Sequence, residues 1–352
     1  MKKLVSIFCA AALALSLAGC GAQAADTNTN TNTTAPVVST VYSLEDATVL
    51  TFTDSGITAQ DGGTGYEIDG TALTIDSAGT YAVTGTCADG SITIKKGTTG
   101  VTLVLNGLSL TSADTAPITC NKSTEVTIIA AEGSVNSLTD SARNNDDEYP
   151  DNETAENAVI KCKDGSQVTL GGTGSLTITA NGKNGIKSGT TTAEEGEASL
   201  TICELTLTIN APVNDAVNAE QTLNVESGTL TIAAADDALH SDLVLNIGAE
   251  GTEGPAITIT ECDEGIEGAE LNIYSGDISI NSSDDCLNAA NSDLSGYDFT
   301  MTISGGTIVA CSASGDGFDS NGDLTITGGS VTVWTANTAD NQPLDADGTI
   351  TV

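Results

Sequence analysis

The chain has 352 residues, of which 48 are acidic and 10 are lysine or arginine, so its formal net charge is -38 at pH 7. Such a charge repels phosphate backbones and anionic lipid surfaces, which excludes nucleic-acid binding, and it attracts cations, of which calcium is the first candidate. Aromatic residues make up only 3% of the chain, yet isoleucine, valine, leucine and threonine alternate almost to its end. We therefore expect a thin aliphatic core rather than a disordered polyanion.

Residues 1–20 have the pattern of a bacterial signal peptide. Lys2 and Lys3 precede an apolar run that is too short to span a membrane comfortably, and small residues lead up to Gly19-Cys20. This ending resembles the lipobox of bacterial lipoproteins, so we predict lipidation of Cys20 and a lipid-anchored location on the extracellular face of the cell membrane, with no other membrane contact. The alternative is an ordinary secretory signal whose cleavage site contains a cysteine. Removal of the segment would leave 8 basic residues against 48 acidic ones, a net charge of -40.

Three further segments follow the signal peptide. Residues 21–39 are rich in threonine and asparagine and cannot bury a core, so we predict a flexible tether. Residues 40–100 contain strand patterns at 69–75 and 79–85 but no clear repeat, and we assign them to an N-terminal cap and the first coils of the following domain. Residues 101–352 contain the repeats of that domain.

Each repeat centres on one aliphatic or aromatic pivot that is flanked by polar residues. The shortest intervals between pivots are 21 and 22 residues, and the stretches between them contain a short alternating strand, a glycine turn and a second alternating strand, as in residues 223–232 and 271–280. The pivots are Ile118, Ile160, Ile186, Val217, Leu239, Ile266, Leu287, Phe318 and Leu344. Three short strands per repeat, with no helical periodicity, predict an all-β fold: a single-stranded parallel β-helix, or solenoid, whose coils bury their inward faces by stacking. A β-sandwich of hairpins is the alternative, but it gives no reason for similarity between successive coils.

Seven cysteines follow Cys20, and none of them forms a CxxC pair. Several occupy positions at which neighbouring repeats carry alanine, serine or glycine, so we favour small buried core residues over disulfides.

The acidic residues of the repeats keep a constant distance from the pivots. Acids recur two and three residues before the pivot and one and three residues after it. Stacked strands lie about 4.8 Å apart, so carboxylates at one position of successive coils repel unless cations neutralise them, and calcium takes six to eight oxygen ligands. The alternative is a solvated acidic edge that keeps the protein soluble. The predicted calcium ligands are Asp215, Asp236, Asp237, Asp242, Asp263, Glu264, Glu267, Asp284, Asp285, Asn288, Asp316, Asp319 and Asp323.

The motifs as a set resemble a known family. The recurring Asp/Asn-Gly/Ala-Ile/Leu pivots, the Leu-Thr-Ile-x-Gly-Gly-x-Ile/Val-Thr-Val strands and residues 101–107 are similar to those of bacterial calcium-containing, carbohydrate-binding β-helix proteins, which resemble family 9 pectate lyases in fold. The resemblance covers residues 45–352 and implies a right-handed parallel β-helix, calcium in the acidic turns, and binding of cellulose or acidic, pectin-like polysaccharides of plant-type or other origin outside the cell. His240, Asn288 and Gln342-Pro343 depart from the repeat pattern.

Two other functions remain open at this stage. A calcium-dependent polysaccharide lyase needs a basic side chain near the ion, and Lys187 is the candidate because it stands one residue after a pivot, near Asp215; alternatively, Lys161 and Lys187 only offset the charge of the acidic positions. A structural surface spacer or adhesin is the third possibility. Aromatic side chains that might hold sugar rings are Tyr149, Tyr274, Tyr297 and Trp334.

Overall fold

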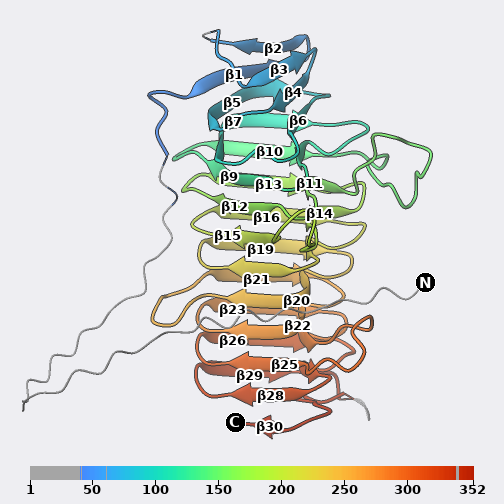
Figure 1. The fold of residues 1–352 in the computed structure, drawn as a ribbon. Helices are drawn as coiled ribbons and strands as arrows, with labels where there is room; N and C mark the ends of the chain where they lie inside the picture. The colour runs from blue at the N-terminus through green and yellow to red at the C-terminus, as the bar shows by residue number, and fades with distance from the viewer. Residues whose placement is uncertain (1–39, 41, 61, 338–340) are drawn as a thin grey trace, which may run out of the picture. The chain divides into compact units, whose positions relative to one another are not determined.

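Parallel strands that pair with the third strand further along the chain dominate the fold (Figure 1). The computed structural model describes residues 40, 42–60, 62–337 and 341–352, which contain thirty strands and no helix. The predicted signal peptide, Cys20 and the whole predicted tether lie outside the described residues. No helix in the described part is long and apolar enough to cross a membrane.

The strands stack in three ladders, each of which receives one strand from every coil. The pivot ladder contains β4 (Ala72–Ile75), β6 (Ser91–Ile94), β8 (Ile118–Cys120), β11 (Ala158–Cys162), β14 (Asn184–Ser188), β17 (Val217–Ala219), the starts of β20 (Leu239–Ile247) and β22 (Ile266–Ile273), β24 (Leu287–Ala289) and β27 (Phe318–Ser320).

The second and third ladders run beside it. The second contains β1 (Thr48–Thr53), the starts of β5 (Gly79–Cys87) and β7 (Val101–Thr111), β9 (Glu125–Ala130), β12 (Gln167–Gly171), β15 (Ser199–Ile202), β18 (Thr222–Val225), the ends of β20 and β22, β25 (Thr300–Ile303), β28 (Asp323–Ile326) and β30 (Ile350–Thr351). The third contains the ends of β5 and β7, β10 (Val135–Thr139), β13 (Ser175–Thr179), β16 (Thr206–Ala211), β19 (Thr229–Ala234), β21 (Ala256–Glu261), β23 (Asp277–Ser282), β26 (Thr307–Ser312) and β29 (Ser330–Trp334).

Antiparallel pairing among the described strands is confined to the N-terminal end. There β2 (Gly56–Ala59) pairs with β1, and β3 (Tyr66–Asp69) pairs with β4. All the other strand pairs are parallel. Because a hairpin joins antiparallel neighbours, the alternative of a β-sandwich made of hairpins is wrong for this chain.

The pivots stack directly on one another, as their spacing predicts. Ile160 pairs with Ile118 and Ile186, and the series continues without a slip through Leu239, Ile266 and Leu287 to an isolated bridge between Phe318 and Leu344. The pivots from Ile118 to Phe318 are at most 1% exposed. Leucine, isoleucine and valine fill the inward positions of the other two ladders as well, so the core is a set of aliphatic columns. Threonine and serine occupy many of the outward positions, where an alternating strand leaves them in solvent.

Six of the seven described cysteines are buried, which agrees with small core residues. Cys311 is exposed instead, because it occupies an outward position of β26, between the inward Ala310 and Ser312.

Replacing a pivot should destabilise the stack. Ile266→Ala removes a fully buried side chain between Leu239 and Leu287, and we expect a loss of about 2–5 kcal/mol in the free energy of unfolding. Urea denaturation measures it. Thr258→Ala, at an exposed position of β21, is the control and should change stability by less than about 0.5 kcal/mol. Equal effects of the two substitutions would contradict the assigned inward register.

Candidate calcium face and lysine pocket

The acidic residues before the pivots stack from coil to coil. The amide of Asp263 donates to the carbonyl of Asp236 at 3.0 Å, and the amide of Asp284 donates to the carbonyl of Asp263 at 2.9 Å. The next residues along, Asp237, Glu264 and Asp285, stand two residues before the pivots that begin β20, β22 and β24. Asp236, Asp237, Asp263, Glu264, Asp284 and Asp285 therefore lie on one edge of the coils, which we call the pivot face.

A unit of three positions repeats along the pivot face. It consists of the residue two before a pivot, the residue one after the same pivot, and the residue one after the next pivot. Asp237, His240 and Glu267 form one such triad, and Asp316, Asp319 and Asp345 form another; within each group the ligand atoms lie within 4.8 Å of one another.

The coils between these two triads have the same three positions occupied by oxygen-bearing side chains. They hold Glu264, Glu267 and Asn288 in one case, and Asp285, Asn288 and Asp319 in the other, according to the strand register. The Nδ2 of Asn288 donates to Oε2 of Glu264 at 2.8 Å. We call these four groups the acidic triads.

Burial and mutual repulsion raise the pKa of several of these carboxyl groups. Burial, contact with Glu264 and the charge of Asp237 raise the pKa of Glu267 to about 9. Burial and the charges of Asp284, Asp319 and Glu264 raise the pKa of Asp285 to about 7, despite a hydrogen bond from the amide of Asp316. The triads thus concentrate negative charge that a bound cation would relieve.

The side chains of the three triads that lack His240 suit calcium. The Oδ1 atom of Asn288 is buried and has no hydrogen-bond partner within the described residues. A buried amide oxygen without a partner costs free energy, and beside Glu264 and Asp319 it is available as a neutral oxygen ligand. Carboxylate and amide oxygens from successive coils are the donors that calcium prefers.

His240 brings its own positive charge to the first triad. Its Nδ1 lies 2.9 Å from Oδ2 of Asp237 and its Nε2 lies 2.9 Å from Oδ1 of Asp242, with Oε1 of Glu267 at 3.9 Å. Burial alone would lower the pKa of His240, but the hydrogen bonds to the two aspartates and the charges of Asp237 and Glu267 outweigh it and raise this pKa to about 11. The imidazolium therefore occupies the place between carboxylates that the sequence assigned to calcium.

Two of the other predicted ligands, Asp215 and Asp323, have hydrogen-bond donors from the protein itself. Asp215 accepts a hydrogen bond from Nδ2 of Asn218 at 2.6 Å. Asp323 begins β28 in the second ladder, and its Oδ1 accepts from the amide of Thr349 at 2.7 Å. In contrast, Asp345 and His240 belong to the triads but were absent from the predicted ligand set. Their position one residue after a pivot was the signal that indicated them.

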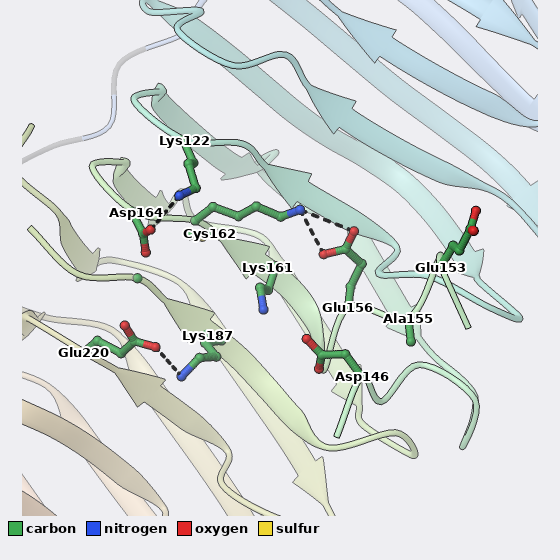
Figure 2. A pocket seen from close by; sticks show the side chains of 12 residues that line it. Lys122, Asp146, Glu153, Ala155, Glu156, Lys161, Cys162, Asp164, Lys187 and Glu220 are labelled. Carbon is green, nitrogen blue, oxygen red and sulfur yellow. Dashed lines mark hydrogen bonds and ion pairs between the residues drawn. The ribbon is translucent and has the colours of Figure 1, made fainter. Parts of the chain in front are cut away.

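A pocket of about 400 Å³ adjoins the pivot ladder at β11 and β14 (Figure 2). Lys161 and Lys187 occupy paired positions of these strands, one residue after the pivots Ile160 and Ile186. The Nζ of Lys187 lies 3.0 Å from Oε1 of Glu220 and 2.8 Å from Oδ1 of Asn218. Asn218 therefore stands between Lys187 and Asp215, so the structure does not place this candidate base directly beside the predicted ligand.

Lys161 differs from the other lysines that line the pocket. Lys122 and Lys163 pair with Asp164 and Glu156 at 2.8 and 3.2 Å. The Nζ of Lys161 donates to Oδ1 of Asn157 at 2.5 Å, and no carboxylate of the described residues lies within ion-pair distance of it. Burial lowers the pKa of Lys161. It is therefore the basic group of this pocket that an incoming anion can reach without first displacing a carboxylate.

The four aromatic candidates do not form a common platform. Tyr149 lines a pocket of about 360 Å³ beside Arg143, and Tyr274 lines a different one. Tyr297 packs on Phe299 with ring centroids 5.5 Å apart. Trp334 is 55% exposed on β29, so it lies on the outer face and not in the core.

Comparison with known proteins identifies the relatives of the stacked strands. The model of a family described as carbohydrate-binding domain-containing proteins matches residues 69–250 and 250–351. The chain belongs to this family.

A solved structure has a similar fold. It is a polysaccharide lyase-like protein from C. thermocellum, described as a gadolinium derivative, which is 22% identical to this chain and gives a TM-score of 0.50. The alignment covers 85% of this chain and 100% of that one. The search of curated proteins gives no match.

Replacing one carboxylate in a triad should weaken calcium binding without unfolding the protein. Asp285→Asn keeps the shape of the side chain but removes one charge, so we expect about tenfold weaker calcium binding, measured by calorimetry. Asp277→Asn, at an exposed outward position of β23, is the matched control and should leave the affinity unchanged. Equal calcium affinity in the wild type and Asp285→Asn would refute the assignment of this triad.

Without calcium, stability should fall as the pH rises from 5 to 8. The pKa values of Asp285, Glu267 and His240 are all raised on folding, to about 7, 9 and 11. A group with a raised pKa binds protons more tightly in the folded state, so its contribution is present below the unfolded pKa and is lost as the pH passes the folded pKa. Melting temperatures in chelator should therefore be higher at pH 5 than at pH 8.

Calcium should reduce the difference in melting temperature between pH 5 and pH 8, because it takes the place of the bound protons. Glu267→Gln should reduce the same difference in chelator. A melting temperature in chelator that is the same at pH 5 and pH 8 would contradict the charge distribution described for the triads.

Proposed function

We propose that this protein is a cell-surface lipoprotein that binds polysaccharide on a calcium-loaded, right-handed parallel β-helix. Three ladders with one strand each per coil support the β-helix. Right-handedness rests on a general rule, since about 98% of crossover connections between parallel strands have that hand. Membership of a carbohydrate-binding family supports the polysaccharide partner.

The observation that carries the calcium proposal is the repeated acidic triad. Asp316, Asp319 and Asp345 bring three carboxylates within 4.8 Å of one another with no basic residue among them, and Asn288 offers a buried oxygen without a partner. Asp285, Asp319 and Asn288 would hold one ion, and the Asp316 triad another. When bound, calcium would supply positive charge to a surface that otherwise repels acidic sugars.

The lysine pocket suggests how the carboxylates of an acidic polysaccharide would be held further along the same ladder. Lys161 has an ammonium group without a carboxylate partner among the described residues and lies next to Lys187 in register. A uronate carboxylate can accept hydrogen bonds from Lys161, while the triads hold cations several coils away. One extended polysaccharide chain would thus contact both lysine side chains and bound calcium ions along one face of the protein.

The anchor and location follow from the first residues of the chain. We propose that Cys20 carries the lipid and that residues 21–39 separate the β-helix from the outer face of the membrane. This arrangement would present the pivot face to extracellular polysaccharide.

A calcium-dependent polysaccharide lyase is a second candidate, favoured by one observation. Burial lowers the pKa of Lys161, and a lysine with a lowered pKa can act as a general base near neutral pH. Lys161 would take up the proton next to a uronate carboxyl group, the electron pair of that C–H bond would form a C=C bond as the glycosidic C–O bond breaks, and the leaving oxygen would take up a proton from water. Lys187, paired with Glu220, is less available for this step.

Binding assays distinguish these functions. We expect the purified chain to be retained on polygalacturonate with calcium, and retention should fall at least about tenfold in chelator. Lys161→Ala should weaken retention, whereas Lys96→Ala, at an exposed ion pair outside the pocket, should leave it unchanged. Ultraviolet absorbance of unsaturated product in the same mixtures would indicate a lyase. Failure to retain polygalacturonate in calcium would refute the proposal and favour a structural spacer or adhesin.

A further inference from the structure

A second cavity, of about 340 Å³, lies at the ends of three strands of the second ladder. It is lined by Asn224 and Glu226 from the β18 coil, Asn246 and Glu250 from the β20 coil, and Tyr274 directly after β22. None of these residues belongs to an acidic triad or to the lysine pocket. Three successive coils therefore build a separate cavity that contains amide and carboxyl side chains and one aromatic wall.

The asparagines of this cavity are held in fixed orientations. The Nδ2 of Asn246 donates to Oδ1 of Asn224 at 2.9 Å, and the Nδ2 of Asn272 donates to Oδ1 of Asn246 at 3.1 Å. An amide nitrogen carries two N–H groups. In the described part of the chain, the Nδ2 of Asn246 uses one of them, so the other is available to a ligand oxygen.

Glu226 and Glu250 supply acceptors and exclude acidic ligands. Neither carboxylate has a hydrogen-bond or ion-pair partner among the described side chains. Glu226 is half-buried, and burial raises its pKa. A neutral hydroxyl group can donate to these oxygens, whereas a uronate carboxylate would be repelled because no cation lines the cavity.

Backbone and ring complete the cavity. Gly248 lines it with a φ of 67°, and a Cβ atom there would come within 2.2 Å of Oγ of Ser275, so only glycine fits at this position. The amide of Tyr274 donates to the carbonyl of Ile247 at 2.9 Å, which ties the tyrosine to the coil before it. The aromatic ring offers an apolar surface for the C–H face of a sugar.

We propose that this cavity is a subsite for an uncharged, hydroxyl-rich sugar unit of a polysaccharide, with Tyr274 as the ring platform, Asn246 as donor and Glu226 as acceptor. The proposal rests on the polysaccharide-binding function above and adds to it a site for neutral sugars. Recognition here needs no calcium, because every polar partner is a side chain of the protein.

Titration calorimetry of the full mature chain with neutral and acidic oligosaccharides tests the subsite. The neutral probes are the β-1,4-linked hexasaccharides of glucose, mannose and xylose, and the acidic probe is hexagalacturonate. We expect at least one neutral probe to bind equally well with calcium and with chelator. Tyr274→Ala should weaken that binding about tenfold, while Tyr274→Phe, which keeps the ring, should retain it.

Two further variants control for folding and location. Glu226→Ala removes an unpartnered acid and should also weaken neutral-sugar binding about tenfold without lowering the melting temperature. Tyr297→Ala removes a ring that packs on Phe299 outside the cavity, and this change should leave neutral-sugar binding unchanged. The proposal fails if no neutral probe binds the wild type, or if Tyr274→Ala and Glu226→Ala bind as the wild type does.

The acidic probe separates this failure from failure of the proposed function. Loss of neutral binding in Tyr274→Ala with intact hexagalacturonate binding supports both sites. Wild-type binding of hexagalacturonate alone overturns only the subsite, whereas binding of a neutral probe alone overturns only the calcium-dependent site for acidic sugars.

Discussion

Direct stacking of equivalent residues on parallel strands is the constraint on which the rest of this structure depends. Ile186, Val217 and Leu239 lie in one inward column because each coil repeats the register of the last. The same register places outward neighbours in columns too, at a separation of about 4.8 Å. A repeating coil therefore cannot bury its pivots in columns without also stacking whatever polar side chains flank them.

The column one residue after the pivots shows how the protein uses this consequence. It runs from Lys161 and Lys187 through Asn218 and His240 to Glu267, Asn288 and Asp319. Positive charge is thus concentrated in the early coils and negative charge in the later ones. His240 stands at the change of sign and neutralises Asp237 and Asp242 from within the chain, whereas the later triads contain no such internal cation.

The second ladder carries a different chemistry on the same frame. Its outward column holds Asn224, Asn246 and Asn272, whose side-chain amides form hydrogen bonds with one another. Stacked asparagines therefore stabilise each other, whereas stacked carboxylates on the pivot face repel each other. A charged face and a cavity for neutral groups can thus coexist because each ladder repeats its own side-chain type. A long polysaccharide suits such a surface, since both the ligand and the protein are repetitive.

The sequence by itself determined the coil register and the stacking of Asp236, Asp263 and Asp284, because these depend only on spacing from an aliphatic pivot that must face inward. It also indicated that cysteines occupy buried positions at which other coils carry small residues. Cys311, which faces outward, is the exception. Only the tertiary structure decided which polar groups meet. His240 reaches Asp242, Lys187 reaches Glu220, and Tyr274 lines one cavity with Asn246, because these arrangements depend on the orientation of each side chain as well as on the strand register. The spacing from the pivot determines where a residue lies in a column of stacked side chains. The partner of a charged side chain depends in addition on the conformations of its neighbours, which do not follow from the repeat.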